Sequence, residues 1–471
     1  MAAKTYPLPG AALGIWYAQH MTASPLYNTA EYVCLRGEVD ESILLKAVND
    51  TVKSAEALHL ECYEEDGQVW HRIKENVSFS CEHQSIKNFE NAEHIMQEDV
   101  ETLIQLQEQP LVRAVLFTEN RQLHYLYLRI HHLVSDAYSF RLIYQQIAER
   151  YHAYLNDLSF TKKFGQYEEV ILEEQHYQSS EDFKQDQEFW SNELAGIDIA
   201  TLSTSPVSDI GEMVLHESIL DEVYWGTVEE AAKRLKVNAQ HIVTAAVAAY
   251  TKRLSNAQSV VLGIPMMGRF GSKAVNVPCT KVNTIPLKID FTVEQSFEQV
   301  ILEVKHKMKL AGKHQKYRHE QMRRDLQLTP EDLLYGPQVN FMPFYDSLNF
   351  GHTIGDMEKV STGVIEDIAF NLYKTREGMR LDVAANHYRY SEQEVMEHSQ
   401  RFKMFFVQLL NDLQLPLFMV NGLNEDEQEQ ILVKWNDTKE AVESTNLSQA
   451  FEVQALRTPH AIAIQMNNQI V

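Results

Sequence analysis

Cysteine is scarce in this sequence, which has four among its 471 residues. No two of them form a Cys-x-x-Cys pair, which argues against a disulfide framework and a zinc ribbon. We expect buried, reduced thiols of a cytoplasmic protein at these positions: Cys34, Cys62, Cys81 and Cys279. The sequence also lacks the GxSxG nucleophile elbow, the P-loop and the GxGxxG dinucleotide fingerprint, so none of those chemistries is indicated.

Positive charge is scarce as well, since 42 Lys and Arg face 66 Asp and Glu and give a formal net charge of −24. Binding to nucleic acid requires clustered cations that neutralise phosphates, so no nucleic-acid partner is expected. No run approaches the roughly 18 consecutive apolar residues of a membrane span. The N-terminus has no continuous apolar core of a secretory signal, so no membrane partner is expected either.

Apolar residues make up 44% of the chain and aromatic residues 10%, which is enough for packed cores. Helical spacing of apolar residues predicts helices within 39–58, 139–157 and 238–254, and apolar runs predict strands over 122–130 and 259–266. Because strands and helices recur in both halves, and the length exceeds the usual limit for a single core, we expect an α/β protein of two lobes.

The acidic, polar stretch 168–190 is interpreted as the region of the boundary between the lobes. We therefore expect an N-terminal lobe over 1–175 and a C-terminal lobe over 176–425. The polar sequence after residue 425 is interpreted as a linker, and the chain ends within an apolar, strand-like segment. Residues 426–471 are accordingly expected to be a linker and the start of a further, truncated domain.

The sequence Arg129–Ser139, RIHHLVSDAYS, contains two adjacent histidines and an aspartate in the loop between a predicted strand and a predicted helix. A neutral imidazole is the side chain best suited to accept a proton near neutral pH. Neighbouring residues of a loop point in different directions, so one of His131 and His132 can face a cavity while the other packs inside. The spacing to Asp136 does not match known zinc sites, and no metal is predicted. The motif alone leaves open that both histidines are structural.

HHLVSDAYS resembles the HHxxxDG signature of the condensation domains of nonribosomal peptide synthetases, which are relatives of chloramphenicol acetyltransferase. Further segments resemble other motifs of this family in the same order, and the resemblance extends over residues 6–425. Several are similar to siderophore synthetases that accept an aryl acid, and residues 426–471 resemble the linker and beginning of an adenylation domain. The matching segments are PGAALGIWYAQHM (9–21), FGQYEEV (164–170), GIPMMGR (263–269), VNTIPLKI (282–289) and KHQKYRHEQMRRD (313–325).

This resemblance implies two chloramphenicol acetyltransferase-like lobes in a V, with a tunnel at their junction. The domain itself would bind no cofactor, because its substrates arrive on the 4′-phosphopantetheine arms of carrier proteins at opposite mouths. An amine on the acceptor carrier would attack the donor thioester. The condensation motifs begin close to Met1, so we expect the donor carrier in a separate protein. The adenylation domain and acceptor carrier are expected downstream.

The resemblance also assigns roles within the signature. His132 occupies the catalytic position, as a base or as a group that orients the amine and stabilises the intermediate. His131 and Asp136 complete the signature, with His131 expected to pack beneath the loop. Asp136 is expected to form a structural ion pair with Arg269.

Three further positions are candidates for substrate contact or support. Asn340 could hydrogen-bond the intermediate or cap a strand, and Ser139 could cap the helix that follows the motif. Ala137 stands where the family has glycine. If that backbone required a positive φ, the methyl group would cost about 1 kcal/mol; if glycine only makes room, alanine would narrow the passage.

Two other functions remain open. One is a stand-alone acyltransferase of the same superfamily that uses acyl-coenzyme A, although the adenylation-like tail has no purpose in such an enzyme. The other is a non-catalytic docking domain, which Ala137 alone favours and the intact His132 disfavours.

Overall fold

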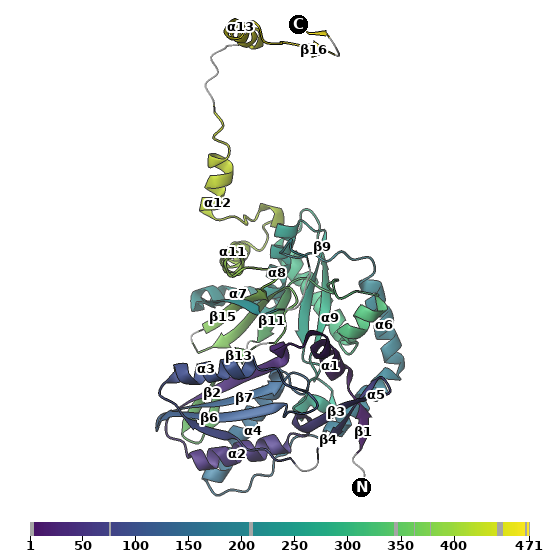
Figure 1. Cartoon of the computed structure of the whole chain (residues 1–471), viewed down its shortest axis with the longest axis vertical. Coiled ribbons are helices and arrows are strands. Elements are labelled where there is room, and N and C mark those ends of the chain that lie inside the picture. Colours follow the sequence, from purple (N-terminus) through teal and green to yellow (C-terminus); the bar gives the residue numbers. More distant parts are fainter. Residues whose placement is uncertain are drawn as a thin grey trace. The chain divides into compact units, whose positions relative to one another are not determined.

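The computed structural model describes residues 4–74, 77–206, 211–342, 347–361, 363–376, 378–439, 446–466 and 469–470. The chain divides into two compact units, Met1–Gly422 and Leu423–Val471. Figure 1 shows the helices and strands with the labels used below. Among the described residues, no helix combines the length and apolar character needed to cross a membrane.

The first unit contains an N-terminal sheet of six strands in the order β12-β13-β2-β7-β6-β5. All neighbours are antiparallel except β5 and β6, which are parallel. Helices α2 and α4 cover one face and α3 the other (Figure 1). The strands are β2 (Asn28–Arg36), β5 (Glu82–Ser85), β6 (Val112–Asn120), β7 (Leu123–His131), β12 (Ser347–Phe350) and β13 (Thr353–Ser361), and the helices are α2 (Glu41–Ser54), α3 (Phe89–Val100) and α4 (Ala137–Leu155).

The same unit contains a C-terminal sheet of six strands in the order β10-β9-β11-β14-β15-β8. Helices α7, α8, α9 and α11 share one apolar core with these strands. The strands are β8 (Met213–Leu220), β9 (Ser259–Met266), β10 (Asn283–Asp290), β11 (Gln338–Met342), β14 (Ile368–Thr375) and β15 (Gly378–Asn386), and the helices are α7 (Glu222–Leu235), α8 (Ala239–Ser255), α9 (Phe297–Ala311) and α11 (Glu392–Asn411).

Smaller elements complete the first unit. Strands β1, β4 and β3 form a three-stranded sheet. Helix α1 lies against side chains of α5 and α10, since a Cβ on Gly10 would lie 3.2 Å from Glu174 Oε1 and one on Gly14 would lie 2.7 Å from Glu320 Oε1. The bounds are β1 (Thr5–Pro7), α1 (Gly10–Thr22), β3 (Leu60–Glu65), β4 (Gln68–Ile73), α5 (Tyr167–Gln178), α6 (Glu181–Glu193) and α10 (His319–Asp325).

The second unit is small. It contains α12 (Glu425–Glu429), a π-helical turn (Gln430–Lys434), α13 (Leu447–Arg457) and the paired strands β16 (Gln465–Met466) and β17 (Gln469–Ile470). The sequence-based assignment of 426–471 to a linker and a truncated adenylation domain remains a prediction, and parts of it (440–445, 467–468 and residue 471) lie outside the described residues.

Most of the elements predicted from apolar spacing are confirmed. Helix α2 follows its cap Asp40, whose side chain accepts from the Ile43 backbone N–H, and strand β9 spans the predicted residues. The acidic stretch 168–190 was interpreted as a boundary, and it is largely helical. Within it, Asp186 accepts from the Tyr177 hydroxyl and contacts His314, which explains how an acidic segment packs against the protein.

One feature of the topology follows from no local pattern. Strands β12 and β13 belong to the C-terminal half of the sequence, yet they extend the N-terminal sheet, because β13 pairs with β2 and β12 pairs with β13. Residues 347–361 therefore cross from one sheet to the other inside the segment predicted as a single lobe. The lobe boundary near residue 175 remains a prediction. The crossover ties the two sheets together and brings residue 363 next to the HHLVSD loop.

Candidate active site

The HHLVSD loop (residues 131–136) joins β7 to α4. Strand β7 lies between β2 and β6, so its backbone is fixed on both sides as the loop begins. The His131 N–H donates to the Leu111 carbonyl at 2.8 Å, and the His132 N–H donates to the Tyr27 carbonyl at 2.7 Å. Both histidines therefore start from a rigid backbone, which is a common arrangement for reactive loop residues.

His131 is locked in place by both of its ring nitrogens. Its side chain is buried, Nε2 lies 2.5 Å from Gln19 Oε1, and Nδ1 accepts from the Leu133 N–H at 3.1 Å. An amide oxygen only accepts and a backbone N–H only donates, so the proton resides on Nε2. Burial lowers the pKa of His131 to about 3, with further contributions from His132 and Arg129. His131 is thus a neutral ring without a free lone pair.

His132 differs from its neighbour in burial and in hydrogen bonding. Its side chain is only half-buried, and within the described part of the chain neither ring nitrogen has a hydrogen-bond partner, although Nδ1 is buried. The Thr280 hydroxyl holds the loop by donating to the His132 carbonyl. A Cβ on Gly363 would lie 3.6 Å from His132 Cδ2, so the ring lies beside the crossover segment. His132 has the free nitrogen that proton transfer requires.

Asp136 and Arg269 form a buried ion pair. Arg269 Nη2 lies 2.8 Å from Asp136 Oδ1 and 2.9 Å from Oδ2, and both side chains are almost completely buried. Burial opposes the charge on Arg269, but Asp136 and Cys279 together more than offset this effect, so the pKa of Arg269 is raised. Arg269 also donates to the carbonyls of Ala274, Val277 and Cys279 at 2.6, 2.9 and 2.6 Å. It thereby fixes the β9–β10 connection (residues 267–282) to the loop.

The Asp136 carboxylate is fully occupied by donors. It accepts from the backbone N–H groups of Ser139, Lys281 and Val282 at 3.0, 3.0 and 3.2 Å, in addition to Arg269. Ser139 belongs to α4 in the N-terminal half, and Lys281 and Val282 belong to the β9–β10 connection in the C-terminal half. Asp136 therefore joins the two halves close to His132. With every lone pair engaged, the carboxylate acts as a structural anchor.

Ser139 and Ala137 occupy the first turn of α4. Ser139 is fully buried, forms a capping box with Asp136, and accepts from the Cys279 N–H at 3.0 Å. This gives Ser139 a capping role, and its hydroxyl does not face open space. Ala137 is exposed and is the first helical residue of α4; it is absent from the positive-φ residues. The condition under which alanine would strain this backbone, a positive φ, is therefore not met at Ala137.

Asn340 lies apart from the other candidates. It is half-buried on β11, opposite Asn371 of β14, and in the described residues its side chain has no hydrogen-bond partner. The structure thus brings together the residues of the signature with Arg269, and it records no contact between any of them and Asn340. A role for Asn340 remains a prediction.

Two functional neighbours were not identified from the sequence. Gln19, in the segment YAQHM, is buried, donates to the Ile104 carbonyl at 2.8 Å and fixes His131. A glutamine among the apolar residues of a helix was the one sequence feature that indicated a buried polar contact at this position. Glu320, in the segment quoted for its resemblance, pairs with Arg318 at 3.0 Å. Burial opposes its charge, but Arg318 and His319 hold the pKa of Glu320 at about 2.

Comparison with known proteins identifies the same family at the level of sequence profile and of individual relatives. The family profile described as Condensation domain matches residues 2–432. The chain is 31% identical to the dimodular nonribosomal peptide synthase of Bacillus subtilis (strain 168), covering 98% of the chain and 20% of that protein. It is 28% identical to enterobactin synthase component F of Escherichia coli (strain K12), covering 97% of the chain and 36% of that protein. The chain thus spans about a fifth to a third of these relatives.

Solved structures are similar over most of the chain. A mutant starter condensation domain of the rhizomide synthetase RzmA, in complex with C8-CoA, has a TM-score of 0.83 at 27% identity, covering 89% of this chain and 98% of that one. The first condensation domain of the CDA synthetase has a TM-score of 0.82 at 25% identity, covering 89% and 99%. The mixed α/β fold with two sheets matches these domains. The chain belongs to the condensation domain family, enzymes that form amide bonds in nonribosomal peptide synthesis.

Proposed function

We propose that this domain joins a carrier-bound acyl thioester to the amine of a carrier-bound aminoacyl group, and that His132 lies in a tunnel where the two substrates meet. The observation that carries the proposal is the contrast between the two histidines. His131 has both nitrogens engaged, whereas His132 has neither engaged in the described structure. In a chain of this family, that contrast leaves His132 as the group available to the reaction.

The reaction follows from these residues. The acceptor nitrogen attacks the thioester carbonyl carbon, and the new C–N bond gives a tetrahedral intermediate. His132 accepts the proton lost by the nitrogen, and the intermediate collapses as the C–S bond breaks. The proton passes to the departing pantetheine sulfur, and the amide stays on the acceptor carrier. Because a thioester is already activated, positioning and modest proton transfer are sufficient.

The remaining residues of the signature hold His132 in position. Gln19 fixes His131, and Asp136 with Arg269 fixes the loop to the β9–β10 connection. Rigid support of this kind matters because a small displacement of a catalytic group greatly lowers the rate. Asn340 lies on β11, its amide has no partner among the residues that the structure describes, and it is the candidate contact for a substrate carbonyl.

We further propose an aryl acid as the donor and a siderophore as the product. The support comes from relatives named enterobactin synthase component F and vanchrobactin synthetase VabF, the latter at 26% identity over 90% of the chain. The aryl group would arrive on a carrier in a separate protein. The acceptor carrier would lie beyond an adenylation domain that begins within 426–471.

The experiment mixes the full-length protein with aryl-loaded donor carrier and follows the carrier-bound amide by mass spectrometry. His132→Ala is expected to lower the rate of product formation by about 10²–10⁴-fold, whereas the matched control His152→Ala, at an exposed position of α4, retains the wild-type rate. Equal product from His132→Ala and wild type would overturn the assignment.

One observation supports a second candidate function, an acyltransferase that uses acyl-coenzyme A. The similar rhizomide synthetase domain was solved with C8-CoA. The same assay therefore includes acyl-coenzyme A as an alternative donor. Turnover with acyl-coenzyme A but not with the loaded carrier would favour this second function.

A further inference from the structure

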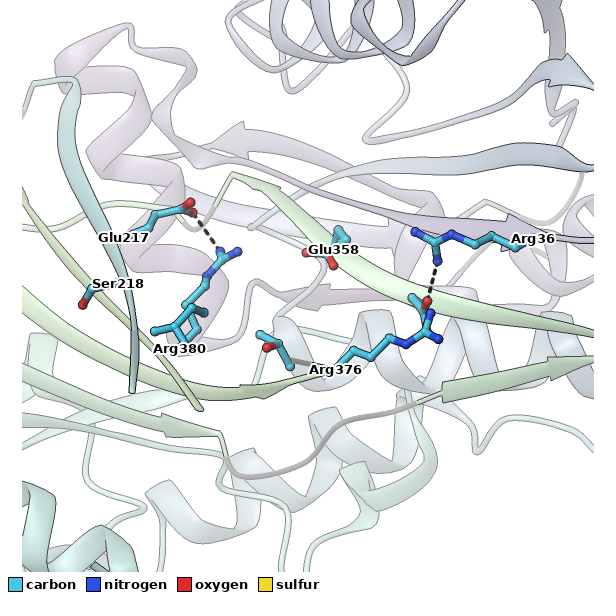
Figure 2. Close-up of a pocket in the computed structure, with 9 residues that line it drawn as sticks. Arg36, Glu217, Ser218, Glu358, Arg376 and Arg380 are labelled. Atoms are coloured by element: carbon cyan, nitrogen blue, oxygen red, sulfur yellow. Dashed lines mark hydrogen bonds and ion pairs between the residues drawn. The ribbon is translucent and has the colours of Figure 1, made fainter. Parts of the chain in front are cut away.

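A cleft of about 480 Å³ opens between the two sheets, away from the HHLVSD loop. Arg36, Asp356 and Glu358 line it from the N-terminal sheet, and Glu217, Arg376 and Arg380 from the C-terminal half (Figure 2). In the β2–β7 register His131 pairs with Asn28, whereas Arg36 lies at the opposite end of β2. At about 3.3 Å per residue, Arg36 lies about 26 Å along β2 from the position that pairs with His131, and Tyr32, which pairs with Glu358, lies about 13 Å from it.

The charged groups of the cleft are balanced in number but not all paired. Arg36 contacts Asp356 at 2.6 Å within the N-terminal sheet, and Arg380 contacts Glu217 at 2.9 Å within the C-terminal sheet. Among the described residues, Glu358 and Arg376 have neither an ion pair nor a hydrogen bond. One free carboxylate thus comes from β13, and one free guanidinium from the β14–β15 turn.

The surroundings of Glu358 favour a cationic partner. Burial raises the pKa of Glu358; Arg380 opposes this effect, whereas Asp356 and Glu217 reinforce it. Figure 2 shows its carboxylate between the two paired arginines, without a bond to either. An ammonium group at this carboxylate would supply the contact that neither arginine makes.

Arg376 offers the complementary site. Its side chain is exposed, and its planar guanidinium can donate two parallel hydrogen bonds to a carboxylate. Ile219 of β8 also lines the cleft and is 40% exposed, which provides an apolar contact. A ligand of one sign would meet as many repulsive as attractive charges here, so the arrangement favours a ligand that carries both.

We propose that this cleft binds a zwitterionic α-amino acid, with its ammonium at Glu358, its carboxylate at Arg376 and its side chain along Ile219. The volume lies within the roughly 300–1,000 Å³ of small-molecule sites. The ligand would bridge the two sheets at a place distinct from His132. This inference is independent of the proposed function.

The first experiment is a thermal-shift screen of the 471-residue chain with each proteinogenic amino acid in turn, followed by calorimetric titration of the strongest. A bound ligand raises the unfolding temperature in proportion to ln(1 + [L]/Kd). The N-acetyl and amide derivatives of that amino acid lack one charge each. Each is expected to bind at least about tenfold more weakly, the loss typical of a charge-assisted hydrogen bond.

The second experiment tests the two anchors. Glu358→Gln and Arg376→Gln are each expected to weaken binding by about tenfold or more. The matched controls Glu230→Gln and Arg121→Gln, at exposed positions outside the cleft, leave it unchanged. The proposal is overturned if no amino acid binds, if the capped derivatives bind as well as the parent, or if the two cleft variants bind like wild type.

Discussion

Each half of the first unit contains a segment in which a sheet strand leads through a short loop to a long helix. The two loops differ in how they are held in place. In the N-terminal half β7 leads through HHLVSD to α4, and in the C-terminal half β15 leads through HYRY to α11. Both helices are long, at 19 and 20 residues, and both begin with a capping box, on Asp136 and on Ser391. The local design is the same.

The difference lies in where the charged residues of each loop find their partners. Asp136 pairs with Arg269 from the other half of the chain, so its loop is fixed against a second wall. Arg389 pairs with Asp367, two segments of the same half, at 2.9 Å. His387 is exposed; its ring packs against Tyr388 with 3.9 Å between the ring centroids, and its Nδ1 lies 3.1 Å from the Glu212 carbonyl. Of these two loops, the one that holds the candidate catalytic histidine is the one whose charged residue pairs with the opposite half of the chain.

The largest expected effect separates His132 from His387. His132→Ala should lower the rate of amide formation by about 10²–10⁴-fold, the usual contribution of a positioned acid–base group. His387→Ala should leave the rate unchanged, because the exposed ring lies in the loop that the other half does not cover. Single-turnover rates with loaded carriers measure both. Equal losses would show that the comparison between the loops has no functional meaning.

The two buried ion pairs should contribute similarly to stability and differently to activity. Asp136→Ala leaves Arg269 unpaired and Asp367→Ala leaves Arg389 unpaired, and each should cost about 3–5 kcal/mol of unfolding free energy. Urea denaturation followed by circular dichroism measures this loss. Adding Arg269→Met to Asp136→Ala should restore part of the stability, because no charge then remains buried alone.

Activity distinguishes the two pairs. The isosteric variants Asp136→Asn and Asp367→Asn, assayed under conditions where both are folded, should differ. Only Asp136→Asn should slow amide formation, since Asp136, unlike Asp367, helps to fix the loop of His132 to the β9–β10 connection. If Asp367→Asn slows the reaction equally, Asp136 acts only through overall stability.

The sequence was sufficient for those features that depend on neighbouring residues. Apolar spacing predicted α2, β7 and β9, and the resemblance implied the Asp136–Arg269 pair that the structure contains. The sequence likewise predicts the capping role of Ser139, because this role depends on Asp136, which is only three positions earlier.

The features that were missed depend on contacts between distant segments. The bond of Gln19 to His131 spans 112 positions, and nothing in the helix around Gln19 identifies its partner. The crossing of β12 and β13 to the N-terminal sheet depends on pairing with β2, some three hundred residues away, and β2 itself carries no local signal of that pairing. The same holds for the cleft, whose two walls come from different sheets.

A smaller effect should separate two buried histidines, one in each half. Burial lowers the pKa of both His71 and His398 to about 4. The backbone of Pro7 and Tyr6 lies close enough to His71 to oppose the effect of burial on its pKa, but neither ring nitrogen makes a well-formed hydrogen bond among the described residues, whereas His398 Nδ1 lies 2.9 Å from the Tyr250 hydroxyl. His71→Phe should therefore stabilise the protein at neutral pH, and His398→Phe should destabilise it by about 1–3 kcal/mol because the hydrogen bond between His398 and the buried Tyr250 hydroxyl is lost.

The acid response of these two histidines has a defined sign. Their folded pKa values lie below the unfolded value of about 6.5, so the unfolded state binds more protons and stability falls as the pH drops from 6.5 towards 4. Each should contribute about 3 kcal/mol to that loss. Urea titrations at several pH values should show a shallower loss in each phenylalanine variant. A slope equal to wild type would mean that the folded pKa of that ring is not lowered and that the ring takes up its proton equally in both states.

The smallest effect concerns the first residue of each long helix, Ala137 in α4 and Glu392 in α11. Ala137→Gly should cost at most about 1 kcal/mol, the conformational freedom of glycine in a helix. The same cost is expected for Glu392→Gly measured against Glu392→Ala, which removes the favourable charge at the helix N-terminus from the comparison.

The rate of Ala137→Gly then tests whether the methyl group matters to the substrates. Ala137 is exposed and has an ordinary helical backbone, so relief of strain cannot contribute to any change. We expect amide formation by Ala137→Gly to stay well within tenfold of wild type, which corresponds to less than about 1.4 kcal/mol in the barrier. A larger acceleration, absent in Glu392→Gly, would mean that the methyl group narrows the route of a pantetheine arm past the start of α4. The two helices would then differ at their first residue as they do in their loops.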